Sequence, residues 1–141
     1  MSDVMDVLSK GLSAARLRVN VLASNIANAE TTHTAEGGPY KRKDIVQMAV
    51  PVKNDFASAL DRMTLSSPSV RGVIEDQSAP RMVHNPGHPD ADQNGYVAFP
   101  NINVVTTMTD LMSASRLYQA NVTAVESVRQ MSQEASSIGR F

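Results

Sequence analysis

The middle of this 141-residue chain contains a run of potential oxygen ligands, Asp90-Ala91-Asp92-Gln93-Asn94-Gly95. The run matches the first half of an EF-hand loop, with ligand types at positions one, three and five and glycine at position six. The second half does not follow, because position twelve is Asn101 instead of a bidentate glutamate. We therefore favour a turn-rich loop whose Asp and Asn side chains bond their own backbone. We therefore expect no saturable calcium binding by this loop below about millimolar calcium.

Two histidines precede the same run. His84 and His88 are four residues apart, and Asp90 and Asp92 follow them. On a helix this spacing could hold zinc. A proline and a glycine lie between the two histidines, so a helix is not expected here. Loop hydrogen bonding is the favoured interpretation, and we predict no metal site.

Catalytic motifs are missing from the sequence. There are no cysteines, no Gly-x-Ser-x-Gly elbow and no glycine-rich phosphate loop. The formal net charge is −1, and the basic cluster Lys41-Arg42-Lys43 is short, which favours a solvated turn over a phosphate-binding surface. We predict no catalytic residues, no cofactor and no nucleic-acid partner.

Both ends of the chain carry apolar residues at steps of three and four, the spacing of a coiled-coil stripe. The N-terminal stripe consists of Met5, Leu8, Leu12, Ala15, Val19, Leu22, Ile26 and Ala29. The C-terminal stripe consists of Val104, Met108, Leu111, Ser115, Tyr118, Val122, Val125, Val128, Met131, Ala135 and Ile138. These patterns predict long helices over residues 3–28 and 104–138 that pair as a coiled-coil-like bundle.

The middle of the chain differs from the ends, because residues 31–103 hold all seven prolines and five of the seven glycines. Apolar, partly β-branched runs between these breakers predict short strands over 45–52, 70–74, 81–84 and 96–99. Residues 56–63 could form one short helix. The predicted fold is mainly α with a small β-rich middle, divided into an N-terminal assembly helix (1–30), a β/loop-rich region (31–103) and a C-terminal assembly helix (104–141).

Local signals mark the two ends of the second predicted helix. Asn103 is a candidate N-cap and Gly139 a candidate terminator of the second helix.

No apolar run approaches the roughly 20 residues that span a bilayer, which predicts no transmembrane segment. Charged residues interrupt the N-terminal apolar positions, so we expect no cleaved signal peptide.

The segment Ala23-Ser24-Asn25-Ile26-Ala27-Asn28-Ala29-Glu30-Thr31-Thr32 resembles the N-terminal signature of bacterial flagellar rod and hook proteins. That family pairs terminal helices around a β-rich middle. Within it, four further segments are similar to the proximal rod subunits: 88–92, 95–98, 100–104 and 113–122. Thr106-Thr107 departs from the family pattern, which usually has acidic residues there.

The resemblance implies a non-enzymatic, torque-transmitting subunit of the rod that crosses the periplasm, assembled helically through its terminal helices. It also implies the partners: copies of the chain itself, B-type and F-type rod subunits, the hook–basal body adaptor and the flagellar type III export apparatus. The alternative is a freestanding helical adaptor that docks one partner through the same stripes. In either case, both ends of the isolated chain should exchange amide hydrogens rapidly, because each exposes an unpaired stripe.

The residues predicted to form the assembly interface come from both terminal helices. They are Leu8, Leu12, Val19, Leu22, Asn25, Ile26, Asn28, Met108, Leu111, Arg116, Tyr118, Asn121, Val122 and Val125. The four polar members lie off the stripes or at their edges, and we expect them to set the register between subunits. The other interpretation, that they only cap and solvate their own helices, stays open at this point.

Overall fold

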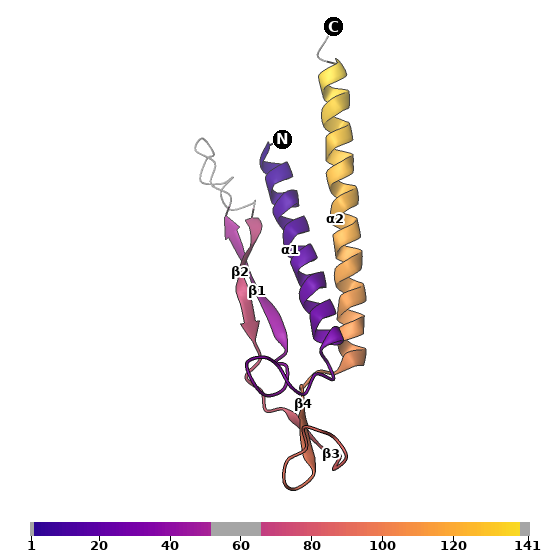
Figure 1. Cartoon of the computed structure of the whole chain (residues 1–141). Helices are drawn as coiled ribbons and strands as arrows, with labels where there is room; N and C mark the ends of the chain where they lie inside the picture. Colours follow the sequence, from indigo (N-terminus) through magenta and orange to yellow (C-terminus); the bar gives the residue numbers. More distant parts are fainter. Residues whose placement is uncertain (1, 52–65, 139–141) are drawn as a thin grey trace.

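The computed structural model describes residues 2–51 and 66–138. In chain order the elements are α1 (Ser2–Ala27), β1 (Lys43–Pro51), β2 (Ser66–Glu75), β3 (Arg81–His84), β4 (Tyr96–Phe99) and α2 (Val104–Ile138). The two helices lie side by side and run in opposite directions, and α1 lies between α2 and the β1–β2 hairpin (Figure 1). The prediction of two long terminal helices around a small β-rich middle is confirmed.

The helix boundaries agree closely with the predicted ones. At the start of α2, the Asn103 side chain accepts a hydrogen bond from the backbone N–H of Thr106 (3.1 Å), as an N-cap residue does. The Thr107 hydroxyl adds a bond to the Asn103 carbonyl (2.8 Å). The predicted terminator Gly139 lies outside the described residues.

The strands form two separate antiparallel pairs. β1 pairs with β2 from Lys43↔Glu75 to Pro51↔Ser66, with one register irregularity between Val46 and Gln47. β3 pairs with β4 over four residues each, with the bounds predicted from the sequence. The first hairpin is longer than predicted, since β2 begins at Ser66 and not at residue 70. The predicted helix over 56–63 lies outside the described residues.

The hydrophobic core of the described residues is small and lies mostly along α1. The buried apolar residues are Ala14, Ala15, Val21, Leu22, Ala29, Val97 and Ala114. Alanines dominate this set, and short side chains allow an element to approach α1 closely on each side. On α2, by contrast, every described side chain from residue 129 to 137 is exposed. None of the described helices is both long enough and apolar enough to cross a membrane.

Candidate functional site

Asn25 connects the end of α1 to the start of β1. Its side-chain N–H donates to the carbonyl of Lys43 (2.7 Å), and its side-chain oxygen accepts from the Lys43 N–H (2.9 Å) and from the Tyr40 hydroxyl (3.1 Å). Asn25 is only 1% exposed. A buried carboxamide that pairs with both backbone groups of one residue replaces a missing strand partner. We expected Asn25 to contact a neighbouring subunit, but its polar groups are used within the chain.

Asn28 also bonds locally. Its side-chain N–H donates to the carbonyl of Ser24 (2.9 Å), and its oxygen accepts from the Thr31 hydroxyl (3.3 Å). The Ser24 carbonyl also accepts the Asn28 backbone N–H (3.0 Å), so the side chain adds a second bond to a carbonyl that keeps its helical partner. Asn28 therefore makes bonds at the end of its own helix, and a contact with a neighbouring subunit stays a prediction. Polar residues of the signature segment therefore hold the turn after α1 in place.

The apolar members of the predicted interface on α1 are covered to different degrees. Leu22 is buried, and Leu8, Leu12, Val19 and Ile26 are half-buried. Because α1 packs against α2 on one side and the hairpin on the other, much of its apolar surface is used inside the chain. The half-buried positions keep part of their surface for other contacts.

At Gly11, α1 lies close to both α2 and the β1–β2 hairpin. A Cβ atom at this position would lie 3.7 Å from the Asn121 side-chain nitrogen and 3.9 Å from the Pro68 ring. Asn121 therefore faces α1 of its own chain and is half-buried. Arg116, one turn earlier on α2, is exposed. Of the two polar residues predicted on α2, only Arg116 is fully available to a partner.

At the start of α2, the residues that are buried differ from those of the predicted stripe. Thr107 is 7% exposed and Ala114 is 4% exposed, although neither belongs to the predicted stripe. Met108, which does belong to it, is 52% exposed. The sequence pattern emphasised large apolar residues, whereas close packing against α1 favours small ones. The later members Leu111, Tyr118, Val122 and Val125 are half-buried, as is expected of a covered stripe.

The rotation of α2 leaves an exposed apolar surface, which we call the α2 flank. It consists of Val105, Met108 and Met112, whose side chains are 76%, 52% and 58% exposed. Their spacing of three and four residues places them on one side of the helix. Exposed apolar side chains that adjoin one another indicate an interaction surface more strongly than scattered ones do.

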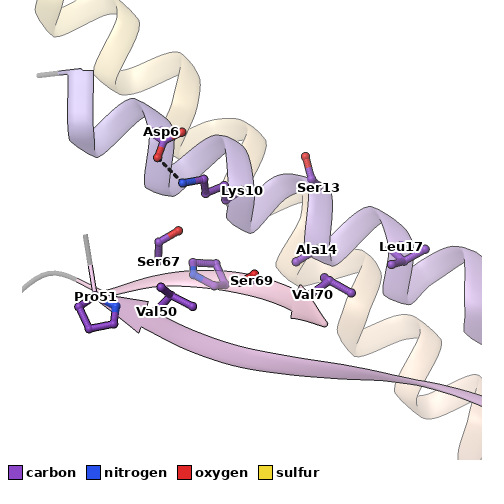
Figure 2. A pocket seen from close by; sticks show the side chains of 11 residues that line it. Asp6, Lys10, Ser13, Ala14, Leu17, Val50, Pro51, Ser67, Ser69 and Val70 are labelled. Atoms are coloured by element: carbon purple, nitrogen blue, oxygen red, sulfur yellow. Dashed lines mark hydrogen bonds and ion pairs between the residues drawn. The ribbon is translucent and has the colours of Figure 1, made fainter. Parts of the chain in front are cut away.

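A cleft of about 560 Å³ lies between α1 and the β1–β2 hairpin (Figure 2). Its walls carry Asp6, Lys10, Ser13, Ala14 and Leu17 from α1 and Val50, Pro51, Ser67, Pro68, Ser69 and Val70 from the hairpin. Lys10 and Asp6 form an exposed ion pair at 2.6 Å. The Ser67 hydroxyl is buried and has no hydrogen-bond partner among the described residues. The sequence offered no signal for this cleft, because residues far apart in the chain build it.

The loop of residues 85–95 is held together by its own polar groups. The Asp92 carboxylate accepts the backbone N–H groups of Asn94 and Tyr96, both at 2.8 Å. Asp90 accepts a bond from the Thr32 hydroxyl (2.7 Å), which ties the loop to the segment after α1. These are the turn bonds that the sequence analysis favoured over calcium coordination.

The two histidines of this region pack on aromatic rings. His84 lies edge-on to Tyr96 with ring centroids 5.1 Å apart, and His88 lies edge-on to Phe99 at 6.1 Å. Within the described residues, no group of three His, Cys, Asp or Glu side chains is placed to hold a metal ion. Gly95 approaches His84 closely and has a φ of +77°, so a larger residue there would be strained.

Two family models match the two ends of the chain. Residues 5–32 match the model described as "Flagella basal body rod protein", and residues 93–138 match "Flagellar basal body rod FlgEFG protein C-terminal". These ranges contain most of α1 and all of α2. Together they contain Asn25 and Asn28, the α2 flank and the α1 wall of the cleft, but not Tyr40 and Lys43, the partners of Asn25.

Curated relatives match the chain over nearly its full length. The protein "Flagellar basal-body rod protein FlgC" of Borreliella burgdorferi is 38% identical over 144 residues, covering 95% of this chain and 94% of the relative. The protein of the same name from Salmonella typhimurium is 36% identical, with coverage of 98% and 97%. A third, from Bacillus subtilis, is 33% identical, with coverage of 96% of each chain.

Proposed function

The chain belongs to the FlgC family of flagellar basal-body rod proteins, and on that premise we propose how it is built into the rod. It is a structural rod subunit, and no residue of the chain is assigned a catalytic role. In the proposal, α1 and α2 pair in a coiled-coil-like manner and run nearly along the rod axis. Neighbouring subunits pack against the surfaces that this pairing leaves open.

The α2 flank is the observation that carries this proposal. Val105, Met108 and Met112 are each more than half exposed near the start of a helix that packs against α1 on one side. Burial of such side chains stabilises an interface by roughly 1.5–3 kcal/mol each. The half-buried Leu111, Tyr118, Val122 and Val125 adjoin the flank and extend the surface toward α1. Long helices arranged along an axis resist twisting, which suits a shaft that transmits torque.

The partners are inferred from the resemblance to flagellar rod subunits. We infer contacts with copies of the chain itself, with B-type and F-type rod subunits, and with the hook–basal body adaptor at the base. We also infer that the flagellar type III apparatus exports the chain to the part of the rod that crosses the periplasm. Arg116, exposed beside the flank, is the polar residue best placed to set the register between neighbours.

Complementation of a strain that lacks this gene tests the proposal. The wild-type chain should restore swimming and should be recovered in purified basal bodies. Met112→Asp should be produced but should not be recovered there, because a carboxylate on the flank opposes its burial. The matched control, Ala120→Asp, adds the same charge at an exposed α2 position that is rotated off the flank, and it should still swim.

Two results would contradict the proposal. Absence of the wild-type chain from basal bodies would remove the assignment to the rod. A purified chain that forms a closed dimer of constant mass at every concentration would favour the freestanding adaptor, since a rod subunit makes repeating contacts that do not close.

A further inference from the structure

We propose that the free end of α2, residues 129–138, docks in the cleft between α1 and the β1–β2 hairpin of a second copy of the chain. The inference rests on the proposed function, because it names the two surfaces that meet between neighbouring subunits of the rod. Neither the α2 end nor the cleft has a partner among the described residues of its own chain.

The α2 end extends beyond the helix that covers the rest of α2. α2 has 35 residues and α1 has 26, so α2 is longer by roughly 14 Å at 1.5 Å per residue. The overhang lies past the N-terminus of α1 (Figure 1). Val128 is the last half-buried side chain before it, and Met131 is 57% exposed. An apolar residue on such an overhang lacks the cover that earlier stripe residues receive.

The cleft fits one face of a short helix. Its volume of about 560 Å³ falls in the range of sites that bury a compact group of atoms. One face of a ten-residue helix presents only about three side chains, at steps of three or four. Here the apolar members of that face are Met131 and Ala135. Methionine suits this role because its flexible side chain fills irregular apolar gaps.

The walls of the cleft match the α2 end in character. Leu17, Val50 and Val70 offer apolar contacts from both sides (Figure 2). Lys10 and Asp6 form the polar edge, and Glu134 on the α2 end carries the charge opposite to that of Lys10. Such exposed pairs add little affinity, but they favour one orientation of the incoming helix.

Among the described elements, α2 of the same chain cannot supply the occupant. The cleft lies on the hairpin side of α1, whereas α2 of the same chain packs against the opposite side and projects away from it (Figure 1). Two complementary surfaces that cannot meet within one molecule produce a heterologous contact. Repetition of that contact generates an open helical assembly and not a closed dimer.

The register of the contact can be calculated from the helix pairing. Asn121 is level with Gly11, at the centre of the α1 wall of the cleft. The middle of the α2 end, residue 133, lies twelve residues further along α2. For parallel copies, the neighbour must therefore be displaced by roughly 18 Å along the helix axes. The displacement is a quantity that a structure of the assembled rod would measure directly.

Cysteine pairs test the contact, because the natural chain contains no cysteine. Ser13→Cys labels the α1 wall, Ser69→Cys labels the hairpin wall, and Met131→Cys labels the α2 end. Leu117→Cys is the matched control, since Leu117 and Met131 are 53% and 57% exposed on the same helix and Leu117 is not part of the α2 flank. Pairs of single variants are produced together in cells that lack the natural gene, and disulfide-linked dimers in purified basal bodies are measured on non-reducing gels.

We expect Met131→Cys to link to a cleft variant about tenfold more than Leu117→Cys does, because docking raises the local thiol concentration. Purified chains at assembling concentration provide the same comparison if a variant is not incorporated in cells. Equal yields for positions 131 and 117, in chains that are incorporated, would overturn the inference and leave the rod function standing. Absence of the wild-type chain from basal bodies would instead count against the rod function itself.

Two further outcomes concern the identity of the occupant. A double variant, Ser13→Cys with Met131→Cys, should give a ladder of linked chains, and a disulfide within one chain would overturn the inference. A photo-crosslinking residue at position 131 should capture another copy of this chain. Capture of a different rod subunit in its place would overturn the assignment of the occupant to a second copy.

Discussion

The helices α1 and α2 each carry an apolar stripe, but the chain itself covers more of the stripe on α1 than of the stripe on α2. α1 packs between α2 and the hairpin and contributes Ala14, Ala15, Val21, Leu22 and Asn25 to the buried set. α2 packs on one side only and contributes Thr107 and Ala114. The difference indicates a division of roles: α1 organises the fold of the subunit, and α2 presents most of the surface that remains for neighbours.

The largest expected effect is the loss of assembly in Val122→Asp. Val122 is half-buried in the later part of the α2 stripe. An unpaired carboxylate in an apolar seam costs several kcal/mol if it stays buried, so the seam would open. The variant should be produced and exported but should not enter the rod, and the cells should not swim.

Ala120→Asp, the control used for the flank, is also the control for Val122→Asp. It adds the same charge at an exposed position of α2 that is two residues away and therefore on another side of the helix, and it should assemble normally. The β1–β2 hairpin packs on the other side of α1 and should keep its structure in both variants. Normal swimming and incorporation of Val122→Asp would show that this face of α2 is not an assembly surface, and the comparison of the two helices would need to be redrawn.

The second largest effect concerns the fold of the single chain. Asn25→Ala removes the partners of the Lys43 N–H and C=O groups at a site that is 1% exposed. Buried unpaired groups should lower the free energy of unfolding by about 3 kcal/mol. Urea unfolding followed by circular dichroism measures this change. Asn28→Ala, which loses bonds at a half-buried helix end, should cost only about 1 kcal/mol.

Equal losses in Asn25→Ala and Asn28→Ala would contradict the special position of Asn25. A variant Asn25→Ala that unfolds like the natural chain but does not assemble would restore the original expectation that Asn25 contacts a neighbour. The pair of variants thus separates a role in the fold from a role in the interface.

Hydrogen exchange on the monomer should resolve the two helices from each other. Residues 14–25 of α1 are covered on two sides, whereas residues 129–137 of α2 are exposed throughout. We expect amides of the α1 segment to exchange about tenfold more slowly than those of the α2 end, because burial and packing raise the free energy of local opening. The sequence alone predicted rapid exchange at both ends. Rapid exchange in both segments would support that simpler prediction, and equally slow exchange in both would contradict it.

Much of the fold could be predicted from the sequence because its signals are local. Apolar periodicity located both helices, Asn103 located the start of α2, and β-branched runs located β3 and β4. The same signals did not predict which side of α2 faces α1. Thr107 and Ala114 are buried because α1 approaches closely there, and nothing in a pattern of large apolar residues indicates that approach.

The interface residues show the same limit. Leu8, Val122 and Val125 keep partly open surfaces, whereas Asn25 and Asn121 turn out to contact their own chain. A polar residue beside an apolar stripe can face either a neighbour or another segment of the same chain. The choice for Asn25 depends on Lys43, which follows a loop whose path the sequence does not determine.

The smallest expected effect concerns Asp76, whose bonds resemble those of Asn25 but lie near the surface. Hydrogen bonds from the Ser78 hydroxyl and the Ser78 N–H, with a weaker contribution from Arg42, lower the pKa of the Asp76 carboxyl below its usual 3.8. A lowered folded pKa means that these bonds stabilise the fold above about pH 3.8 and that their contribution is lost as the pH falls through the folded pKa.

Titration of the Asp76 carboxyl by NMR should separate the causes of this shift. Ser78→Ala removes the largest cause and should move the pKa of Asp76 back up toward 3.8, whereas Arg42→Gln should move it less. Neither variant should lose as much stability as Asn25→Ala does. Water can replace the hydrogen bonds of a solvent-exposed carboxylate, whereas it cannot reach the Asn25 carboxamide. A larger shift in Arg42→Gln would mean that charge dominates over hydrogen bonding at this turn. If Ser78→Ala lost as much stability as Asn25→Ala, burial would not explain why Asn25 matters more to the fold than an exposed residue does.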